Sequence, residues 1–189
     1  DARARRSGRE SQLAAHLERV DKELAALDAE KAQTAFVDLS REIEKLGKGE
    51  FMVVESDESD RSFLHLAPIL AVVTNIDREH LDHYADLSQI LAAFIEFVNK
   101  VPFYGASILC IDDENVQRIL PSVKRRMITY GANAQADLRI SHATAGHLSS
   151  EFRLTRGTQD LGLFRLNVPG SHNISNAAAA AAIALELDI

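Results

Sequence analysis

The sequence has a single cysteine, no tryptophan and only four prolines in its 189 residues. With no second thiol, an internal disulfide framework is excluded, which fits a reducing cytoplasm. Cys110 lies in the apolar run Ser107-Ile-Leu-Cys-Ile111, where a small buried side chain is expected. No apolar run reaches the length of a transmembrane helix, and no signal peptide precedes the first expected strand. The sequence therefore predicts a cytoplasmic protein with no membrane segment.

Several short catalytic motifs are also missing. The sequence holds no Ser-His-Asp signature, no Cys-x-x-Cys and no Gly-x-x-x-x-Gly-Lys-[Ser/Thr] phosphate loop; the only Gly-Lys pair lies in the turn Gly47-Lys48-Gly49. Basic residues are not in excess either. Acidic and basic residues balance within positions 1–48, so the net charge of −7 belongs to the remainder of the chain. That acidity argues against nucleic-acid binding and suits a site that attracts divalent cations.

The N-terminal quarter is predicted to be separate from the rest. Residues 1–10 contain almost no large apolar side chain and predict a disordered basic arm, with a grip on an anionic partner as the alternative. Residues 11–46 favour helices with an a/d seam, which is formed by Leu13, Leu17, Val20, Leu24 and Leu27. Two or three heptads are compatible with a helical hairpin and with a dimerising coiled coil that mediates self-association. Both remain open at this point.

Residues 47–189 predict an α/β domain. Apolar runs are expected to form buried parallel strands at 51–55, 69–76, 106–111 and 126–131. Helices are expected between them, one capped by Asp86 and running to about Lys100, and another beginning at Asp112 with acids in its first turn. Three segments with period two then predict an antiparallel meander, near 137–141, 150–156 and 162–168. An Ala-rich helix from about Asn173 to Leu187 should allow close approach of another element.

Two of the expected strands end in acids. Glu55-Ser-Asp-Glu-Ser-Asp60 follows the first, and Asp77, Glu79, His80 and Asp82 follow the second. The carboxyl ends of parallel strands meet at one edge of the sheet, where open α/β sheets bind ligands, so the cluster is a candidate Mg²⁺ and phosphate site. Glu55 is as compatible with a surface acid as with a metal ligand. Asp57, Glu58 and Asp60 favour loop and cap roles.

Two polar segments are candidate binding elements. Thr74 and Asn75, at the end of the second strand, could bind a substrate or simply cap the loop. His172, Asn173 and Asn176 open the last helix, where Ser171 or Asn173 could be an N-cap or the segment could hold a nucleotide base or ribose. His65, within Phe-Leu-His-Leu, is expected to pack.

Five motifs in order resemble the Mur ligases, and most closely the family members that join L-alanine to UDP-N-acetylmuramate. They are Glu55-Ser-Asp-Glu-Ser-Asp-Arg-Ser-Phe-Leu-His-Leu66, Val73-Thr-Asn-Ile-Asp-Arg-Glu-His-Leu-Asp82, Pro102-Phe-Tyr-Gly105, Ile128-Thr-Tyr-Gly131 and Pro169-Gly-Ser-His-Asn-Ile-Ser-Asn-Ala-Ala178. The resemblance covers the later part of the family's central ATP-binding domain. It implies a mostly parallel sheet flanked by helices, with a small antiparallel sheet beside it.

The resemblance also implies a reaction and roles. ATP phosphorylates a carboxylate, the amino-acid amine attacks the acyl phosphate, and Mg²⁺ neutralises phosphoryl charge. By position, Glu55 and His80 match the family's metal ligands and catalytic site. His172, Asn173 and Asn176 match the nucleotide-proximal segment, and Thr74, Asn75 and Asp77 match the substrate-facing loop.

The departures from the family pattern imply an incomplete enzyme. In the family, a UDP-binding domain and a phosphate loop precede the acidic strand, and an amino-acid-binding domain follows the central one. The sequence shows none of these three parts, so this chain is expected to be inactive alone. The alternative is a non-catalytic ligase-like scaffold whose helical N-terminus binds a partner.

Overall fold

The computed structural model describes residues 51–59, 61–78, 84 and 86–189. The chain divides into two units, Asp1–Glu55 and Ser56–Ile189. The predicted arm at 1–10 and the predicted hairpin or coiled coil at 11–46 lie outside the described residues. Both therefore stay predictions, as does self-association through them.

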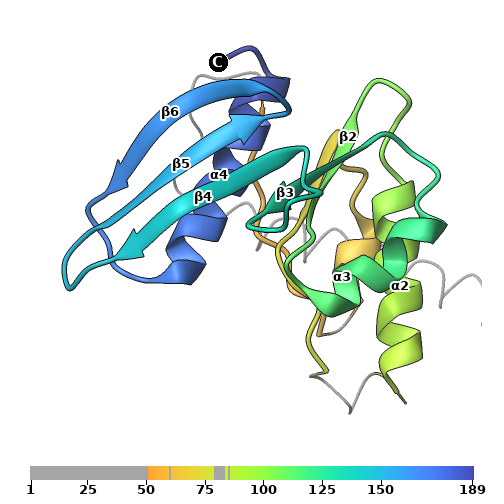
Figure 1. The fold of residues 1–189 in the computed structure, drawn as a ribbon. Coiled ribbons are helices and arrows are strands. Elements are labelled where there is room, and N and C mark those ends of the chain that lie inside the picture. The colour runs from red at the N-terminus through yellow and green to blue at the C-terminus, as the bar shows by residue number, and fades with distance from the viewer. Residues whose placement is uncertain (1–50, 60, 79–83, 85) are drawn as a thin grey trace, which may run out of the picture. The chain divides into compact units, whose positions relative to one another are not determined.

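A six-stranded mixed sheet forms the centre of the second unit (Figure 1). Its strands follow chain order across the sheet: β1 Leu70–Val73, β2 Ala106–Cys110, β3 Met127–Gly131, β4 Leu138–Ala145, β5 Ser150–Arg156 and β6 Gln159–Leu166. The pairs from β1 to β4 are parallel, and β4–β5 and β5–β6 are antiparallel. The predicted α/β fold, with its mostly parallel strands and its meander, is confirmed.

The antiparallel strands do not form a sheet of their own. Strand β4 pairs with β3 in parallel register at Tyr130↔Leu138 and Gly131↔Arg139, and so joins the meander to the parallel strands. Period-two patterning predicts which residues alternate between the two faces of a strand, but it carries no information about the neighbouring strand. The patterning therefore predicted the meander, and the small antiparallel sheet that the family resemblance implied is continuous with the parallel strands in one sheet.

The strand predicted at 51–55 is absent. These residues have no regular secondary structure, and Phe51, Met52 and Val53 are 52%, 52% and 82% exposed. An apolar run becomes a strand only when a neighbour supplies backbone hydrogen bonds, and no described strand pairs with these residues. The second predicted strand is also shorter than expected, because only Leu70–Val73 pair with β2.

Helices cover both faces of the sheet. Helices α2 (Leu87–Asn99) and α3 (Glu114–Ile119) lie on one face, and α4 (Ser171–Glu186) lies on the other. Strand β2 is buried along its whole length, and its side chains alternate between the two cores. Leu109 joins the core under α2 and α3, whereas Ile108 and Cys110 join the core under α4. The predicted burial of Cys110 is confirmed.

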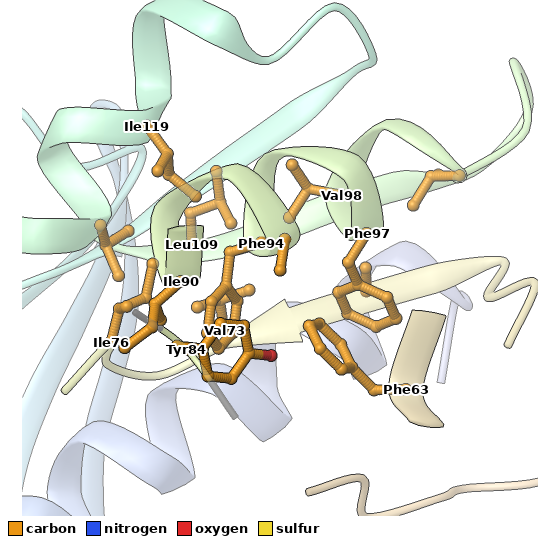
Figure 2. Packing of buried hydrophobic residues seen from close by; sticks show 14 residues of the cluster. Phe63, Val73, Ile76, Tyr84, Ile90, Phe94, Phe97, Val98, Leu109 and Ile119 are labelled. Atoms are coloured by element: carbon orange, nitrogen blue, oxygen red, sulfur yellow. The ribbon is translucent and has the colours of Figure 1, made fainter. Parts of the chain in front are cut away.

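The core under α2 is rich in aromatic rings, as Figure 2 shows. The ring of Phe63 packs against Phe94 and Phe97, with centroids 5.3 and 5.1 Å apart. Each such buried aromatic ring contributes about 1.5–3 kcal/mol of hydrophobic stabilisation. His65, in the same 3-10 helix Ser62–His65, is exposed, so the prediction that it packs is wrong. Phe63 is the buried residue of this helix instead, because one face of a single 3-10 turn lies against the core and Phe63 is on that face.

The start of α2 follows the predicted chemistry, and the starts of α3 and α4 differ from it. Asp86 caps α2 by accepting a hydrogen bond from the backbone N–H of Gln89, as predicted. Asp113 caps α3 in the same way through Val116. Helix α4 instead begins after Gly170 without a side-chain cap. Its Ala178, Ala179 and Ala182 are buried against the sheet, so the predicted close approach is confirmed. No helix in the described part of the chain is long and apolar enough to span a membrane.

Candidate functional site

Polar side chains gather where the parallel strands end. Strand β1 leads to Thr74–Asp77, β2 leads to Asp112–Asn115, and β3 leads to Ala132 and Asn133. Because these strands are parallel and adjacent, their carboxyl ends lie along one edge of the sheet. We call this the carboxyl edge.

The predicted substrate residues form one connected group in the loop after β1. The Thr74 hydroxyl donates to Asn75 Oδ1 at 2.9 Å, and Asn75 Nδ2 donates to Asp77 Oδ2 at 2.8 Å. All three side chains are exposed, while Ile76 between them is 1% exposed and lies in the core. The buried isoleucine fixes the loop to the domain, so three polar side chains are presented together at the carboxyl edge. We call this segment, Thr74–Asp77, the β1 loop.

The loop after β2 ties the neighbouring loops together. Asp112 accepts hydrogen bonds from the backbone N–H groups of Ala132 and Asn133, at 2.7 and 2.9 Å. On its other side, Asn115 Nδ2 donates to the carbonyl of Ile76 at 2.7 Å. The sequence did not single out either residue. It assigned Asp112 to the first turn of the following helix, whereas Asp113 is the cap and Asp112 bonds across to the loop after β3.

Gly131 makes the contact with Asp112 possible. Its φ is +145°, and a Cβ there would lie 2.6 Å from the carboxyl carbon of Asp112. A side chain would therefore collide with the group that accepts the two backbone N–H groups. The glycine in the motif Ile128-Thr-Tyr-Gly131 was a sequence signal for a close approach at this point, but only the structure names its partner.

Helix α4 brings the predicted nucleotide residues to the same edge. Ser175, in its second turn, lies 3.6 Å from the Sγ of Cys110, the last residue of β2. The start of α4 therefore lies near the carboxyl edge. His172 and Asn176 are exposed there. Asn173 is half-buried and donates from Nδ2 to the carbonyl of Pro169 at 2.6 Å. Asn173 and Ser171 are not N-caps, so that alternative is wrong.

Tyr130 lies under this end of α4. Its side chain is fully buried, and its hydroxyl is the one buried side-chain polar atom in the described residues without a hydrogen-bond partner. Burial raises the pKa of Tyr130 well above its ordinary value, and the nearby Cys110 raises it further. The phenol is therefore neutral at physiological pH. Its role in the fold is to support the sheet face on which α4 rests.

The predicted metal pair is not brought together by the described residues. Glu55 is exposed and belongs to the first unit, and His80 lies outside the described residues. Among the described residues no group of three or more His, Cys, Asp or Glu side chains could hold a metal ion. The assignment of Glu55 and His80 as metal ligands and catalytic residues therefore stays a prediction.

The acidic segment is nevertheless tied to the segment that follows His80. The Tyr84 hydroxyl donates to the Glu58 carbonyl at 2.8 Å, and the Arg61 guanidinium lies 4.9 Å from the centroid of the Tyr84 ring. Asp57 accepts a hydrogen bond from the backbone N–H of Ser59 at 2.8 Å, which confirms its predicted loop role. Glu58 and Tyr84, both in the second unit, are thus in direct contact.

The model of the Mur ligase middle domain matches residues 16–184 of this chain. The chain belongs to the Mur ligase family. The UDP-N-acetylmuramate–L-alanine ligase of Solibacter usitatus is 63% identical over 145 residues, which are 77% of this chain and 31% of that protein. The enzyme of the same name from Desulfatibacillum aliphaticivorans is 51% identical over 145 residues, 77% of this chain and 32% of its own. This Mur ligase chain spans about a third of the length of these relatives.

Solved Mur ligases share the fold. UDP-N-acetylmuramate:L-alanyl-gamma-D-glutamyl-meso-diaminopimelate ligase from Neisseria meningitides superimposes with a TM-score of 0.64 at 24% identity, covering 76% of this chain and 45% of that one. MurF from Thermotoga maritima, solved in complex with ADP, gives a TM-score of 0.51 at 18% identity, covering 64% and 28%. At these identities the likeness establishes the fold, and it agrees with the mixed sheet described above.

Proposed function

We propose that this chain is the central domain of an ATP-dependent ligase that joins L-alanine to UDP-N-acetylmuramate, a step of peptidoglycan precursor synthesis. The observation that carries the proposal is the convergence of the β1 loop and the start of α4 at the carboxyl edge. The β1 loop follows the parallel strand β1, and Ser175 of α4 lies 3.6 Å from Cys110 at the end of β2, which supports a substrate role for the first segment and a nucleotide role for the second. The 63% identity to a protein of that name supports this choice of substrates.

The β1 loop suits a polar, carboxylate-bearing substrate. Thr74, Asn75 and Asp77 offer hydroxyl, amide and carboxylate groups whose mutual hydrogen bonds fix their directions before a ligand arrives. Fixed donors and acceptors lose little side-chain entropy on binding, so they position a reacting carboxylate efficiently. Their role here is to hold the sugar-nucleotide, with its carboxylate directed toward the phosphoryl donor.

The start of α4 suits a nucleotide. Mur ligases are ATP-dependent. His172 and Asn176 are exposed at this helix start, and Asn173 is held by the Pro169 carbonyl. With no side-chain cap, the first-turn N–H groups of α4 and the positive end of its dipole are left for an anionic or polar ligand. We assign His172, Asn173 and Asn176 to the base or ribose of ATP.

Mg²⁺ would be held by Glu55 and His80 in this proposal. The exposed carboxylate of Glu55 is the hard oxygen donor that Mg²⁺ prefers, and Mg²⁺ usually takes only one or two carboxylates besides phosphate and water. The bound ion would neutralise charge on the transferring phosphoryl group.

We expect this chain alone not to form the amide. Its sequence holds no phosphate loop to cradle the β- and γ-phosphates. The domain limits also remain part of the proposal, with residues 47–189 as the ligase domain and residues 11–46 as a helical segment that could self-associate. Because the reaction consumes ATP, we place it in the cytoplasm, with no nucleic acid or membrane as partner.

A chimera tests the proposed function directly. The aligned 145 residues of the Solibacter usitatus ligase would be replaced by those of this chain, and phosphate release would be measured with UDP-N-acetylmuramate, ATP and Mg²⁺, with and without L-alanine. We expect phosphate release that depends on L-alanine. A chimera that folds, binds ADP and releases no phosphate would contradict the proposal and favour a non-catalytic scaffold.

A further inference from the structure

Asn115 connects two elements that are far apart in the sequence. It lies in the first turn of α3, and its Nδ2 donates a 2.7 Å hydrogen bond to the carbonyl of Ile76, 39 positions earlier. A carbonyl only accepts hydrogen bonds, so the amide nitrogen must be the group that faces it. Asn115 is half-buried, which protects this bond from competition by water.

Ile76 is held in place through both its side chain and its backbone carbonyl. Its side chain is 1% exposed and lies in the core with Val116 and Ile119 of α3, as Figure 2 shows for Ile119. Its carbonyl is bound by Asn115 of the same helix. The residue at the centre of the β1 loop therefore has a fixed position and a fixed peptide orientation relative to α3.

That fixation determines where the substrate residues point. Asn75 and Asp77 flank Ile76, and the peptide plane that carries the Ile76 carbonyl also carries the N–H of Asp77. Turning that plane changes the ψ of Ile76 and the φ of Asp77, and Asp77 is the residue whose carboxylate accepts the 2.8 Å hydrogen bond from Asn75. We infer that Asn115 is a positioning residue that holds the β1 loop in its substrate-binding conformation, an inference that rests on the proposed function of that loop.

Gln117 provides a matched control on the same helix. Its Nε2 donates to the carbonyl of Ile111 at 2.8 Å, so it makes the same kind of bond as Asn115. Its partner follows β2, and the β1 loop is not involved. Gln117 is more exposed than Asn115, so the loss of its amide should weaken the fold somewhat less, and only loss of Asn115 should loosen the β1 loop.

The first measurement needs no ligand. Backbone ¹⁵N relaxation of the full 189-residue chain would be compared between wild type, Asn115→Ala and Gln117→Ala. We expect the order parameters of Asn75, Ile76 and Asp77 to fall from about 0.85 toward about 0.6 in Asn115→Ala and to stay unchanged in Gln117→Ala. Asn115→Asp keeps the shape but loses the donor, and it should behave like Asn115→Ala even if the alanine variant proves too unstable to study. Wild-type loop order in either Asn115 variant would overturn the inference.

The second measurement adds the substrate. UDP-N-acetylmuramate would be titrated into the same samples while the amide signals of the β1 loop are followed. We expect about three- to tenfold weaker binding in both Asn115 variants and no change in Gln117→Ala, which is the factor expected for one hydrogen bond. Equal weakening in all three variants would mean a purely structural role and would overturn the inference.

The two measurements separate the inference from the function on which it rests. If wild type shows no response of the β1 loop to UDP-N-acetylmuramate, the proposed substrate assignment fails. The relaxation data still decide whether Asn115 holds the loop.

Discussion

The Tyr84 hydroxyl donates a 2.8 Å hydrogen bond to the backbone carbonyl of Glu58, 26 residues earlier in the chain. The Tyr84 ring is 1% exposed and belongs to the core under α2. A core residue thus fixes the end of the acidic segment. The same Glu58 carbonyl also accepts from the backbone N–H of Arg61, which closes the turn.

Tyr84→Phe should lower the free energy of unfolding by about 1 kcal/mol, because it removes one hydrogen bond and leaves the ring in place. Urea unfolding of the 189-residue chain measures this. Tyr104→Phe is the control, since Tyr104 is 65% exposed, and it should change stability very little. Equal stabilities for Tyr84→Phe and wild type would show that the hydrogen bond contributes nothing net.

Gly131→Ala should be clearly more destabilising than Gly157→Ala. Both glycines have a positive φ, +145° and +56°, but a Cβ at Gly157 meets nothing within 4 Å. Gly157→Ala should therefore cost only about 1 kcal/mol for the left-handed backbone. At Gly131 the Cβ would also displace the Asp112 carboxylate from Ala132 and Asn133, which brings the cost to about 2–3 kcal/mol. Thermal unfolding of the two variants compares them, and equal losses would show that the Asp112 contact is unimportant.

Glu186 should be coupled to Arg126 more strongly than a surface pair is. Its side chain is 8% exposed, accepts from both terminal nitrogens of Arg126, and lies 3.5 Å from Arg156. A double-mutant cycle with alanine should give a coupling of about 1 kcal/mol, reduced by the exposure of Arg126. The control pair Arg165 and Glu151, 3.9 Å apart and exposed, should give a coupling close to zero. Similar couplings for the two pairs would contradict this prediction.

The Asp86 cap should titrate below its ordinary pKa. The Ser88 hydroxyl, and after it the backbone N–H of Gln89, lower the pKa of Asp86 below 3.8 by bonding to its charged form. A lowered folded-state pKa means that the cap stabilises α2 above about pH 3.8 and that this contribution is lost as the pH falls through the lower folded-state value. Carbon-detected NMR titration measures the pKa, and Ser88→Ala should raise it toward 3.8. A pKa at or above 3.8 in wild type would disprove the effect.

Glu55→Ala should weaken the binding of ATP with Mg²⁺ by about tenfold or more if Glu55 is a metal ligand. Calorimetric titration of the chain with ATP, in the presence and absence of Mg²⁺, measures this. Asp57→Ala is the matched control, because Asp57 has a loop role in accepting the Ser59 N–H. The prediction fails if both variants bind like wild type, or if omission of Mg²⁺ makes no difference to wild type.

The main elements of the domain follow from local signals in the sequence. Continuous apolar runs, such as Ala106–Cys110, predicted strands buried on both faces, and period-two segments predicted the meander. Asp86 predicted the start of α2, because a cap acts within one helical turn. The five motifs predicted the family. These signals are local, or are patterns in the order of residues, so one chain contains them in full.

How distant segments meet depends on contacts that exist only in the folded chain. Whether residues 51–55 form a strand depends on a neighbouring strand, and whether the meander is a separate sheet depends on two residue pairs between β3 and β4. Asp112 looked like a helix acid until the loop after β3 was placed beside it. Asn115 gave no signal at all, because its partner is a backbone carbonyl 39 residues away, and every residue type has the same carbonyl. A hydrogen bond to a backbone carbonyl does not depend on which residue carries that carbonyl. The hydrogen bond from Asn115 to Ile76 can therefore be identified only in the folded chain.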